Sequence, residues 1–421
     1  MALDEILFEE QFSSDTITEM IKDLKEIDHS LFRQIVYGVI ENLYYLDFIL
    51  KKFIKLKINK IDKKIINIIR IAIYELVFLD IKSYAIINEA VNNTKKINFK
   101  LKNFVNGVLR NIDRNIEKAK EIKEEDFSNY DDYISTKYSV NLDIINYLKK
   151  YYKNYVEIIK SFNKKPSFSI RVNTFLIYKE ELMQILKNKG YEIEESEISK
   201  DSLIIKNPNK IMECSEFNDG FFTIQDESSA LVAEIMNPKE NSDVLDLCAA
   251  PGSKSTHILQ KMNDKGFILS NDISKEKLKL IKENYDRLKL KNYKIISFNA
   301  INDNKDLYNK FDYVLVDAPC SGLGVVKRKP EIKIRRFVND IYSLSNIQKE
   351  IINRAYNYLK SGGILIYSTC TLGNVENQDV LEQFLDKFKD MKLVEINHKK
   401  YIELLPNETY DGFFISKLLK M

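Results

Sequence analysis

Glycine and proline are distributed so unevenly that they divide the chain into two structural classes. Residues 1–165 contain no proline and only Gly38 and Gly107, whereas all seven prolines and the other ten glycines follow. These two residue types are the strongest interruptions of regular structure, so the first part is predicted to be entirely helical. Apolar residues recur there at helical spacing through 35–44 and 65–76. We expect a bundle of roughly five to seven helices in this part.

The hydrophobic pattern changes after Pro166. Residues 168–173 alternate between apolar and polar like a strand, and residues 179–189 have the helical period. Two short apolar runs follow at 202–206 and 221–225. Together these segments predict a small α+β module.

Beyond residue 226, predicted helices alternate with predicted strands, which is the rhythm of a doubly wound parallel sheet. The strands are expected at 244–248, 267–271, 294–298, 312–317 and 363–368. The carboxyl ends of such strands line the ligand crevice, so the loops after them should converge on one site. With an acid-rich link after the bundle, the expected domains are 1–125, 126–225 and 226–421.

Composition limits the class of protein. At 421 residues and 44% apolar content, the chain is long enough for two or three domains, each with its own core. The 65 basic and 62 acidic residues nearly balance, so contact with nucleic acid has to come from local patches. The four cysteines show no close pairing and the N-terminus has no signal-peptide pattern, which predicts a reducing, cytoplasmic setting. We also expect no membrane span, because no apolar run reaches about 18 residues. We expect no metal, because the three histidines and four cysteines lack metal-site spacing.

The first strand of the expected sheet ends in a turn of small residues, Cys248 to Lys254. This turn lacks the Gly-x-Gly-x-x-Gly pattern of dinucleotide sites, but small side chains let the backbone approach a ligand. The helix that follows would present free N–H groups to a carboxylate. Asp272 stands 20 residues after Gly252, at the end of the next strand, and suits the hydroxyls of a ribose. An adenosine with an amino-acid tail fits both features. The alternative is a structural glycine turn with an incidental aspartate.

Two cysteines follow two other strand ends. Cys320 lies in the loop that starts at Asp317, and Cys370 comes 50 residues later. Two thiols at one sheet edge suit covalent chemistry on a pyrimidine, in which a thiolate adds to carbon 6 and makes carbon 5 nucleophilic. Asp317 suits the ring nitrogen and amino edge of cytosine. The alternative for each cysteine is a buried small apolar side chain. Sequence order alone does not assign which thiol attacks.

Six basic residues lie between 327 and 336, directly after the Cys320 loop. A solvated helix face is one interpretation of such a run, and phosphate contact is the other. Because of its location we favour phosphate contact, with Lys327, Arg328 and Lys329 as RNA-binding residues.

Short motifs along the chain resemble known families. The α/β part carries Asp246–Lys254, Asp317–Gly322, Ser368–Cys370 followed by Glu376-Asn377, and Asp411–Phe414. Together they resemble the motifs of RNA cytosine-5 methyltransferases of the Sun class. The helical part resembles the transcription factor NusB through Ile73–Leu76, Ile87–Val91 and Phe104–Leu109. A NusB-like domain fused to such a catalytic domain is the arrangement of the bacterial 16S ribosomal RNA cytosine-5 methyltransferase B family, also called Sun or Fmu.

The resemblance implies a multidomain fold, with an all-α NusB-like bundle, a small α+β RNA-binding module and an α/β Rossmann-like methyltransferase domain that uses S-adenosylmethionine. It also implies that Cys370 is the nucleophile, that Cys320 assists product release and that Asp317 holds the base. S-adenosylmethionine is expected along Cys248, Ala249, Ala250, Pro251, Gly252, Ser253 and Lys254, and at Asp272, Asn299 and Asp317.

Further consequences of the resemblance concern RNA and two departures from the family pattern. Arg171 and Asn173 match the Arg-Val-Asn of the family's small module and are expected to bind RNA. Asn299 stands where an aspartate is common, and Ser253 stands where the second glycine of the cofactor turn is usual. The implied reaction is methylation of carbon 5 of a cytosine in 16S ribosomal RNA by a monomeric enzyme. The alternatives are a transfer-RNA target and a non-catalytic RNA-binding or assembly factor. The motifs leave open which cytosine is modified and whether the helical domain binds RNA or protein.

Overall fold

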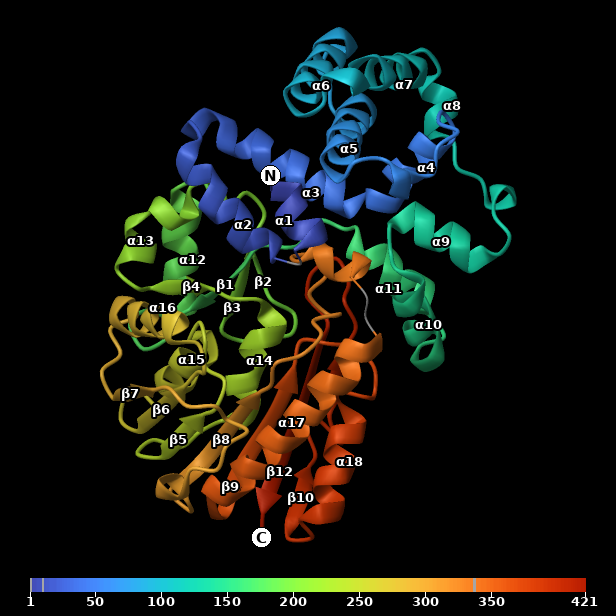
Figure 1. The fold of residues 1–421 in the computed structure, drawn as a ribbon. Helices are drawn as coiled ribbons and strands as arrows, with labels where there is room; N and C mark the ends of the chain where they lie inside the picture. The colour runs from blue at the N-terminus through green and yellow to red at the C-terminus, as the bar shows by residue number, and fades with distance from the viewer. Residues whose placement is uncertain (1, 10, 336–337) are drawn as a thin grey trace. The chain divides into compact units, whose positions relative to one another are not determined.

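A computed structural model describes residues 2–9, 11–335 and 338–421 (Figure 1). The chain forms two compact units. Unit 1 consists of Met1–Asn163 together with Val326–Phe337, and unit 2 consists of Lys164–Val325 together with Val338–Met421. The chain therefore returns to unit 1 after it has built much of unit 2. No pattern in the sequence predicted this return.

Unit 1 is built of helices, as the scarcity of glycine and proline predicted. In α5 the Asp62 side chain caps the N-terminus by accepting the N–H groups of Lys64 and Ile65. Apolar residues at helical spacing, such as Ile69 and Ile73, are fully buried and face the core of the bundle. The α-helices of unit 1 are α1 (Ala2–Phe8), α2 (Ser13–Met20), α3 (His29–Glu41), α4 (Leu43–Lys51), α5 (Lys63–Phe78), α6 (Ser83–Ile97), α7 (Lys102–Arg114), α8 (Ile116–Lys120), α9 (Tyr130–Tyr138), α10 (Leu142–Tyr151) and α11 (Tyr155–Phe162).

Eight α-helices precede residue 121 in the described part of the chain, more than the five to seven expected. The difference arises at asparagines that interrupt a continuous apolar pattern. Asn42 separates α3 from α4 and Asn115 separates α7 from α8, and each side-chain amide donates at 2.8 Å to a carbonyl of the preceding turn. None of the helices that the structure describes is long and apolar enough to span a membrane.

Residues 326–335 pack into unit 1 through two charged side chains that are fully buried. The Glu331 carboxylate accepts hydrogen bonds from the backbone N–H and the hydroxyl of Ser13, at 3.2 and 2.7 Å. The Lys333 ammonium donates to two backbone carbonyls and to the side chain of Asn163. Buried charges need such partners, so this segment is an integral piece of the helical unit.

Unit 2 begins with the small module, a four-stranded antiparallel sheet in the order β2-β3-β1-β4. Ile170 and Val172 of the central strand β1 are fully buried against Leu182 and Leu186 of α12. The short edge strand β2 was not predicted. The elements are β1 (Ser169–Val172), α12 (Lys179–Asn188), β2 (Ile193–Glu195), β3 (Ser202–Ile205), α13 (Ser215–Asn218) and β4 (Phe222–Ile224).

The rest of unit 2 is a mixed sheet in the order β10-β12-β9-β8-β5-β6-β7, with β11 paired to β12. Strands β5 to β9 pair in parallel and match the five predicted strands, whereas β12 is antiparallel to β9 and was not predicted. The elements are α14 (Glu227–Met236), β5 (Asp243–Asp246), α15 (Ser253–Lys261), β6 (Phe267–Asn271), α16 (Lys275–Arg287), β7 (Tyr293–Ile296), β8 (Phe311–Asp317), α17 (Val338–Tyr358), β9 (Leu359–Thr369), α18 (Gln378–Lys387), β10 (Met391–Val394), β11 (Ile402–Leu404) and β12 (Phe413–Lys420).

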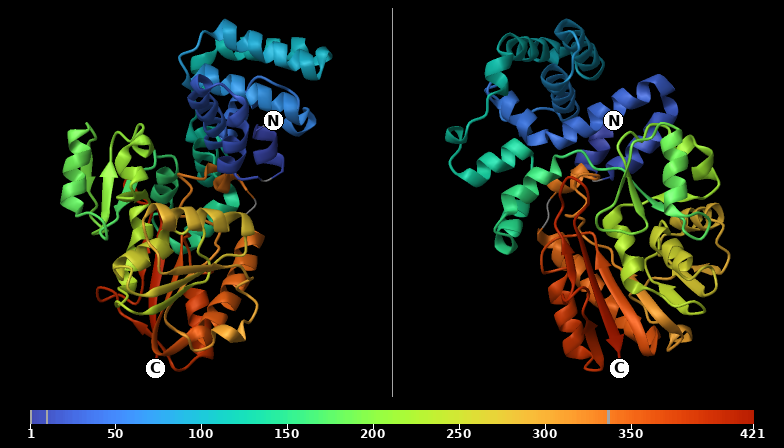
Figure 2. Two further views of the ribbon diagram at one scale, coloured as in Figure 1. Left: turned by 90° about the vertical axis from the view of Figure 1, so that its left-hand side faces the viewer. Right: turned by 180° about the vertical axis from the view of Figure 1, so that it is seen from behind.

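Alternate residues of the central strands feed two apolar cores. On β8, Val314 and Val316 pack with α17 and α18, whereas Tyr313 and Leu315 pack with α14, α15 and α16 on the other face. Helices therefore cover both faces of the sheet, as Figures 1 and 2 show. Because both faces are covered, the strand ends are the natural place for a ligand.

Candidate functional site

The candidate site lies where the strand order of the large sheet reverses. Strand β5 is flanked by β6 on one side and β8 on the other, and β9 continues the sheet beyond β8. Open α/β sheets bind ligands at this switch point, outside the carboxyl ends of the strands. The loops after β5, β8 and β9 carry the three motifs singled out in the sequence, and the structure brings them together.

The two thiols meet at this edge. Cys320 Sγ and Cys370 Sγ are 3.2 Å apart, and both residues are half-buried. Close backbone approach holds the loops: Gly324 donates its N–H to the Cys370 carbonyl at 3.0 Å and accepts from Gly412 at 2.9 Å. A β-carbon on Gly324 would lie 2.0 Å from the Gly412 carbonyl oxygen, so the contact requires glycine. The hydrogen bond with Cys370, followed by burial, raises the pKa of the Cys320 thiol well above its ordinary value.

Asp317 is held by a neighbour at each oxygen. Lys254 Nζ lies 2.7 Å from Oδ2, and the Ser368 hydroxyl donates to Oδ1 at 2.8 Å. The side chains of Lys254 and Asp317 are only 14% and 24% exposed, so solvent screens this ion pair weakly. Burial alone would lower the pKa of Lys254, but the Asp317 carboxylate and then Cys370 raise it above its ordinary value. Lys254 thus connects the cofactor turn with both Asp317 and the Cys370 thiol.

Glu376 anchors the loop that carries Cys320. Its carboxylate accepts hydrogen bonds from the backbone N–H of Ser321 at 2.9 Å, from the Ser321 hydroxyl, and from the Gln348 amide at 2.9 Å. The side chain is fully buried, and burial raises its pKa. In the sequence Glu376 stood out only as part of a motif, because its partners lie far away along the chain.

The turn after β5 forms a cradle at the start of α15. Gly252 has φ +100°, in the left-handed region, and a β-carbon there would come within 3.1 Å of the Ile281 backbone. Helix α15 begins at Ser253, and within the described residues no side chain caps its N-terminus. Its first N–H groups are therefore open to an acidic group. These features fit the cofactor turn that the sequence predicted.

Asp272 follows β6 and faces this turn. Its Oδ2 accepts the N–H of Ala250 at 3.0 Å, and its Oδ1 accepts the N–H of Ser274 at 2.9 Å. These bonds fix the carboxylate and leave each oxygen able to accept another hydrogen bond. Asn299 follows β7, and its carbonyl oxygen already accepts the N–H of Ile301 at 3.2 Å. The side-chain carbonyl of Asn299 can therefore accept one further hydrogen bond.

Two residues that matter for this edge were given no role in the sequence analysis, although Asp246 begins one of its motifs. Asn271 is fully buried and donates to the Leu247 carbonyl at 2.9 Å and the Phe298 carbonyl at 3.1 Å, which ties the ends of β5, β6 and β7 together. Asp246 accepts the Ser255 hydroxyl at 2.5 Å, beneath the cofactor turn. Burial, partly offset by this hydrogen bond, raises the pKa of Asp246 to about 7. Their hydrogen bonds join residues of different elements, so no local sequence pattern indicated these contacts.

The structure places Arg171 and Asn173 in the interior of unit 2. Both side chains are fully buried. Arg171 donates to the carbonyl of Ser253, and Asn173 donates to the carbonyls of Gly220 and Leu288 at 2.9 and 3.0 Å. Phosphate contact needs an accessible side chain, so this burial argues against the RNA-binding role that the resemblance implied for these two residues.

The basic run after the Cys320 loop divides into interior and surface positions. Lys327 is only 5% exposed and Lys333 is fully buried, whereas Arg328 is half-buried and Lys329 is exposed. Arg336 lies outside the described residues. Lys329, and in part Arg328, retain the accessibility that phosphate contact requires.

Asp201, Glu234 and His257 form a separate cluster with side chains of metal-binding type. One oxygen of Asp201 already meets His257 Nε2 at 2.8 Å and Lys261 Nζ at 3.1 Å. Burial lowers the pKa of His257 to about 3, so its imidazole is neutral. Because the Lys261 ammonium already balances this carboxylate, we interpret the cluster as an internal polar network and assign no metal to it.

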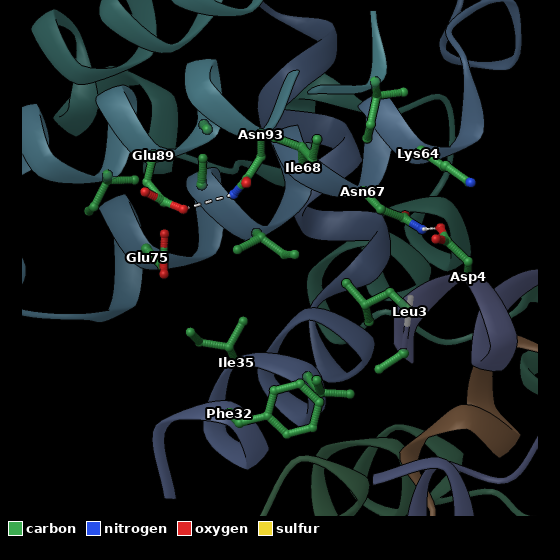
Figure 3. A pocket seen from close by; sticks show the side chains of 17 residues that line it. Leu3, Asp4, Phe32, Ile35, Lys64, Asn67, Ile68, Glu75, Glu89 and Asn93 are labelled. Carbon is green, nitrogen blue, oxygen red and sulfur yellow. Dashed lines mark hydrogen bonds between the residues drawn. The ribbon is translucent and has the colours of Figure 1, made fainter. Parts of the chain in front are cut away.

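The helical unit contains a cavity of about 540 Å³ lined by residues of α1, α3, α5 and α6 (Figure 3). Its walls are mainly apolar, and two amides at its edges pair with acids: Asn67 with Asp4 at 2.8 Å and Asn93 with Glu89 at 3.1 Å. The residues that line it include no thiol and no histidine. We therefore do not expect covalent chemistry in this cavity.

Comparison with known proteins gives the same three parts. A profile described as "16S rRNA methyltransferase RsmB/F" matches residues 233–419, the NusB family matches 1–114, and an RsmF/B-like ferredoxin-like domain matches 144–212. A Bacillus subtilis protein named "Probable ribosomal RNA small subunit methyltransferase B" is 33% identical over 429 residues, which cover 97% of this chain and 95% of that protein. The chain belongs to the ribosomal RNA small subunit methyltransferase B family. In the same family, the Proteus mirabilis protein is 31% identical over 410 residues, covering 97% of this chain and 94% of its own length.

Two solved structures resemble this chain in fold. The crystal structure of PH0851 matches with a TM-score of 0.81 at 26% identity, covering 97% of this chain and 94% of that one. NSun6 from Pyrococcus horikoshii with SFG matches with a TM-score of 0.56 at 26% identity, covering 65% of this chain and 97% of that one. The predicted fold class is thereby confirmed: a NusB domain, a small ferredoxin-like module and a Rossmann-like methyltransferase domain. The expected boundaries after residues 125 and 225 stay predictions.

Proposed function

We propose that this protein methylates carbon 5 of a cytosine in 16S ribosomal RNA, with S-adenosylmethionine as methyl donor. The observation that carries the proposal is the pair of thiols 3.2 Å apart at the sheet switch point. A thiol that adds to a pyrimidine and a second group that assists release act on adjacent carbons of one ring, and two neighbouring thiols can reach both. The ion pair of Lys254 with Asp317 beside them supplies a charged contact for the base.

Cys370 is the better candidate for the attacking thiolate. Contact with Cys370 and burial raise the pKa of the Cys320 thiol, which favours its neutral form over a thiolate. Charge interaction between Cys370 and Lys254 is among the causes that raise the pKa of Lys254, so the ammonium favours negative charge on this sulfur. Both features support the order that the family resemblance implied.

The proposed reaction has three steps. The Cys370 thiolate adds to carbon 6 of a cytosine that has left its stack, and carbon 5 gains electron density. When bound, S-adenosylmethionine would supply an electrophilic methyl group for carbon 5, and the broken methyl–sulfonium bond would leave S-adenosylhomocysteine. A base then removes the carbon 5 proton, the bond between carbon 6 and sulfur breaks, and the Cys370 thiolate is regenerated. Cys320 is the residue that we assign to this release step.

Asp317 is assigned to the base. With Oδ2 on Lys254 and Oδ1 on Ser368, its carboxylate has a fixed orientation before substrate arrives. A carboxylate in that position can hydrogen-bond the nitrogen 3 and amino edge of cytosine as the ring is activated.

The residues at the α15 cradle fit the proposed cofactor. The open N–H groups at Ser253 suit its carboxylate, Asp272 suits the ribose hydroxyls, and Asn299 is assigned to the adenine. We further propose that the protein acts as a monomer in the cytoplasm, with Lys329 and Arg328 among its RNA contacts.

The test uses RNA that contains 5-fluorocytosine, which traps the covalent adduct. Cys370→Ala should lose methyl transfer and trapping, because no thiolate can add to carbon 6. The Cys320→Ala variant should still form the bond between Cys370 and carbon 6. It should then remain covalently joined to methylated RNA, which is seen as a slow-migrating band in denaturing gels. Cys214→Ala, at a free cysteine in the small module, is the matched control and should behave like the wild type.

Two outcomes would change the proposal. Robust turnover by Cys370→Ala would remove that thiol from the mechanism, and an adduct formed by Cys370→Ala but not by Cys320→Ala would exchange the two roles. Mapping 5-methylcytosine in RNA from cells with and without the protein identifies the substrate. A lost mark in transfer RNA, or no lost mark at all, would favour the transfer-RNA and non-catalytic alternatives respectively.

A further inference from the structure

We propose that Arg171 is a positioning residue of the cofactor site: from β1 of the small module it holds the first turn of α15 and adds positive charge beneath it. The inference rests on the proposed function, because it assumes that this turn receives the acidic tail of S-adenosylmethionine. It assigns to the small module a part in cofactor binding as well as any part in RNA binding.

The first observation is the set of contacts of the guanidinium. Arg171 donates to the backbone carbonyl of Ser253, the first residue of α15, and to the hydroxyl of Thr256 in the same turn at 3.2 Å. It also donates to the side chain of Gln225, just after β4. One planar fork therefore links the small module to the turn that bears the open N–H groups.

The second observation is that this cation is buried at a cost to stability. The side chain is 0% exposed, and within the described residues no carboxylate lies within ion-pair distance of it, although the charge of Asp201 partly offsets the lowering of its pKa by burial. Arg171 Nε has no hydrogen-bond partner in the described part of the chain. Burying a cation with partial satisfaction is unfavourable compared with a well-packed apolar side chain, so packing alone does not account for an arginine at this position.

Electrostatics gives the buried charge a use. Burial lowers the pKa of Arg171 to about 9, and the group remains a cation at neutral pH. The N-terminus of α15 carries partial positive charge of its own, which favours an anion near the first turn. A guanidinium bonded to the same turn in a poorly screened interior strengthens that potential.

A second arginine between the small module and the α/β domain supplies a matched control. Arg287, at the end of α16, donates to the carbonyls of Phe217 and Phe222 in the small module at 3.1 and 2.7 Å. It therefore holds the same module to the same domain with the same chemical group. Its hydrogen-bond partners lie outside α15, so Arg287→Met loosens the contact between module and domain without removing a hydrogen bond to that helix.

The experiment compares two ligands by titration calorimetry. S-adenosylhomocysteine carries the amino-acid carboxylate, whereas 5′-methylthioadenosine has the same adenosine without that tail. For Arg171→Met we expect the affinity for S-adenosylhomocysteine to fall at least about tenfold, as for loss of a charged hydrogen-bonding group. The affinity of Arg171→Met for methylthioadenosine should change by less than about threefold. In Arg287→Met, the ratio of the affinity for S-adenosylhomocysteine to that for methylthioadenosine should remain that of the wild type. Arg171→Lys keeps the charge but not the fork, and should fall between wild type and Arg171→Met.

The outcomes separate the possible roles. Equal weakening of both ligands by Arg171→Met would show a merely structural residue, and unchanged binding of both would remove Arg171 from the site. If Arg171→Met does not fold, as judged by its thermal melt, Arg171→Lys decides by the same ratio. Failure of the wild-type protein to bind S-adenosylhomocysteine would instead contradict the proposed function itself.

Discussion

At the scale of single residues, the cofactor edge is built from carboxylates whose orientation the backbone fixes. Asp272 accepts one N–H group with each oxygen, and Asp246 lies buried under the same turn against Ser255. The first is half-exposed and suits hydroxyl groups of a ligand. The second is shielded from water, and its protonation state therefore couples to folding.

Asp272→Ala tests the ribose assignment. Leaving ligand hydroxyls without an acceptor should weaken S-adenosylhomocysteine binding by roughly 5- to 150-fold, corresponding to about 1–3 kcal/mol. Glu276→Ala is the control, because Glu276 is an exposed acid near Asp272 whose carboxylate accepts from the Ser274 side chain. Titration calorimetry measures both. Equal affinities of the wild type and Asp272→Ala would contradict the assignment.

Asp246 predicts a pH dependence of stability. Burial raises its pKa from 3.8 to about 7, so the folded protein binds a proton more tightly than the unfolded chain. The stabilisation from this proton is complete below about pH 4 and is lost as pH rises through about 7. Urea unfolding measures the free energy of unfolding of the wild type and of Asp246→Asn. As pH rises over this range, the wild type should lose up to roughly 4 kcal/mol of stability relative to the variant. A difference that is constant with pH would mean that Asp246 stays ionised in the fold.

The sequence predicted those site residues that follow a strand directly, and missed those whose role depends on a distant partner. Cys320, Cys370 and Asp317 were accessible to prediction because position after a parallel strand places a residue at the ligand edge. Arg171 also lies in a strand, but its burial depends on α15, which comes more than 80 residues later. No sequence pattern predicts that contact, so the resemblance to an RNA-binding module led us to expect Arg171 at the surface.

At the scale of elements, the segment after the Cys320 loop is where the structure differs most from the interpretation based on sequence. The sequence suggested one basic patch, whereas the structure buries Lys327 and Lys333 within the helical unit and exposes Lys329. The same run therefore serves packing at some positions and remains available to RNA at others.

Replacing Arg328 and Lys329 together by alanine tests the exposed part. Each lost phosphate contact should lower the slope of log affinity against log salt by roughly 0.7–0.9, and cofactor affinity should stay unchanged. Lys387→Ala, at an exposed lysine at the end of α18, controls for the loss of charge in general. Filter binding over a range of salt concentrations measures the slope. A slope like that of wild type would move the RNA-binding assignment to other parts of the chain.

The elements themselves were predictable to different degrees. Strands β5 to β9 lie within a few residues of the prediction, because strands covered on both faces are nearly continuous apolar runs. Strand β12 was missed, since Ser416, Lys417 and Lys420 interrupt its apolar sequence. Lys417 and Lys420 donate their ammonium groups to backbone carbonyls of unit 2, an arrangement that only the folded chain reveals.

At the scale of the whole molecule, the chain contributes two separate stretches to each unit. Residues 326–335 complete the helical unit through Glu331 and Lys333, although most of that unit ends at Asn163. Ser13 and Asn163 form hydrogen bonds with Glu331 and Lys333, which lie in a much later part of the sequence.

This return of the chain affects how the protein is made. Domains generally fold in order of synthesis, the N-terminal one first. Here the helical unit emerges first from the ribosome, but its buried acceptors and donors for Glu331 and Lys333 stay open until the later segment has also emerged. The final packing of the first unit therefore has to follow the synthesis of the Cys320 loop, and a chain that stops before residue 333 leaves both units unfinished.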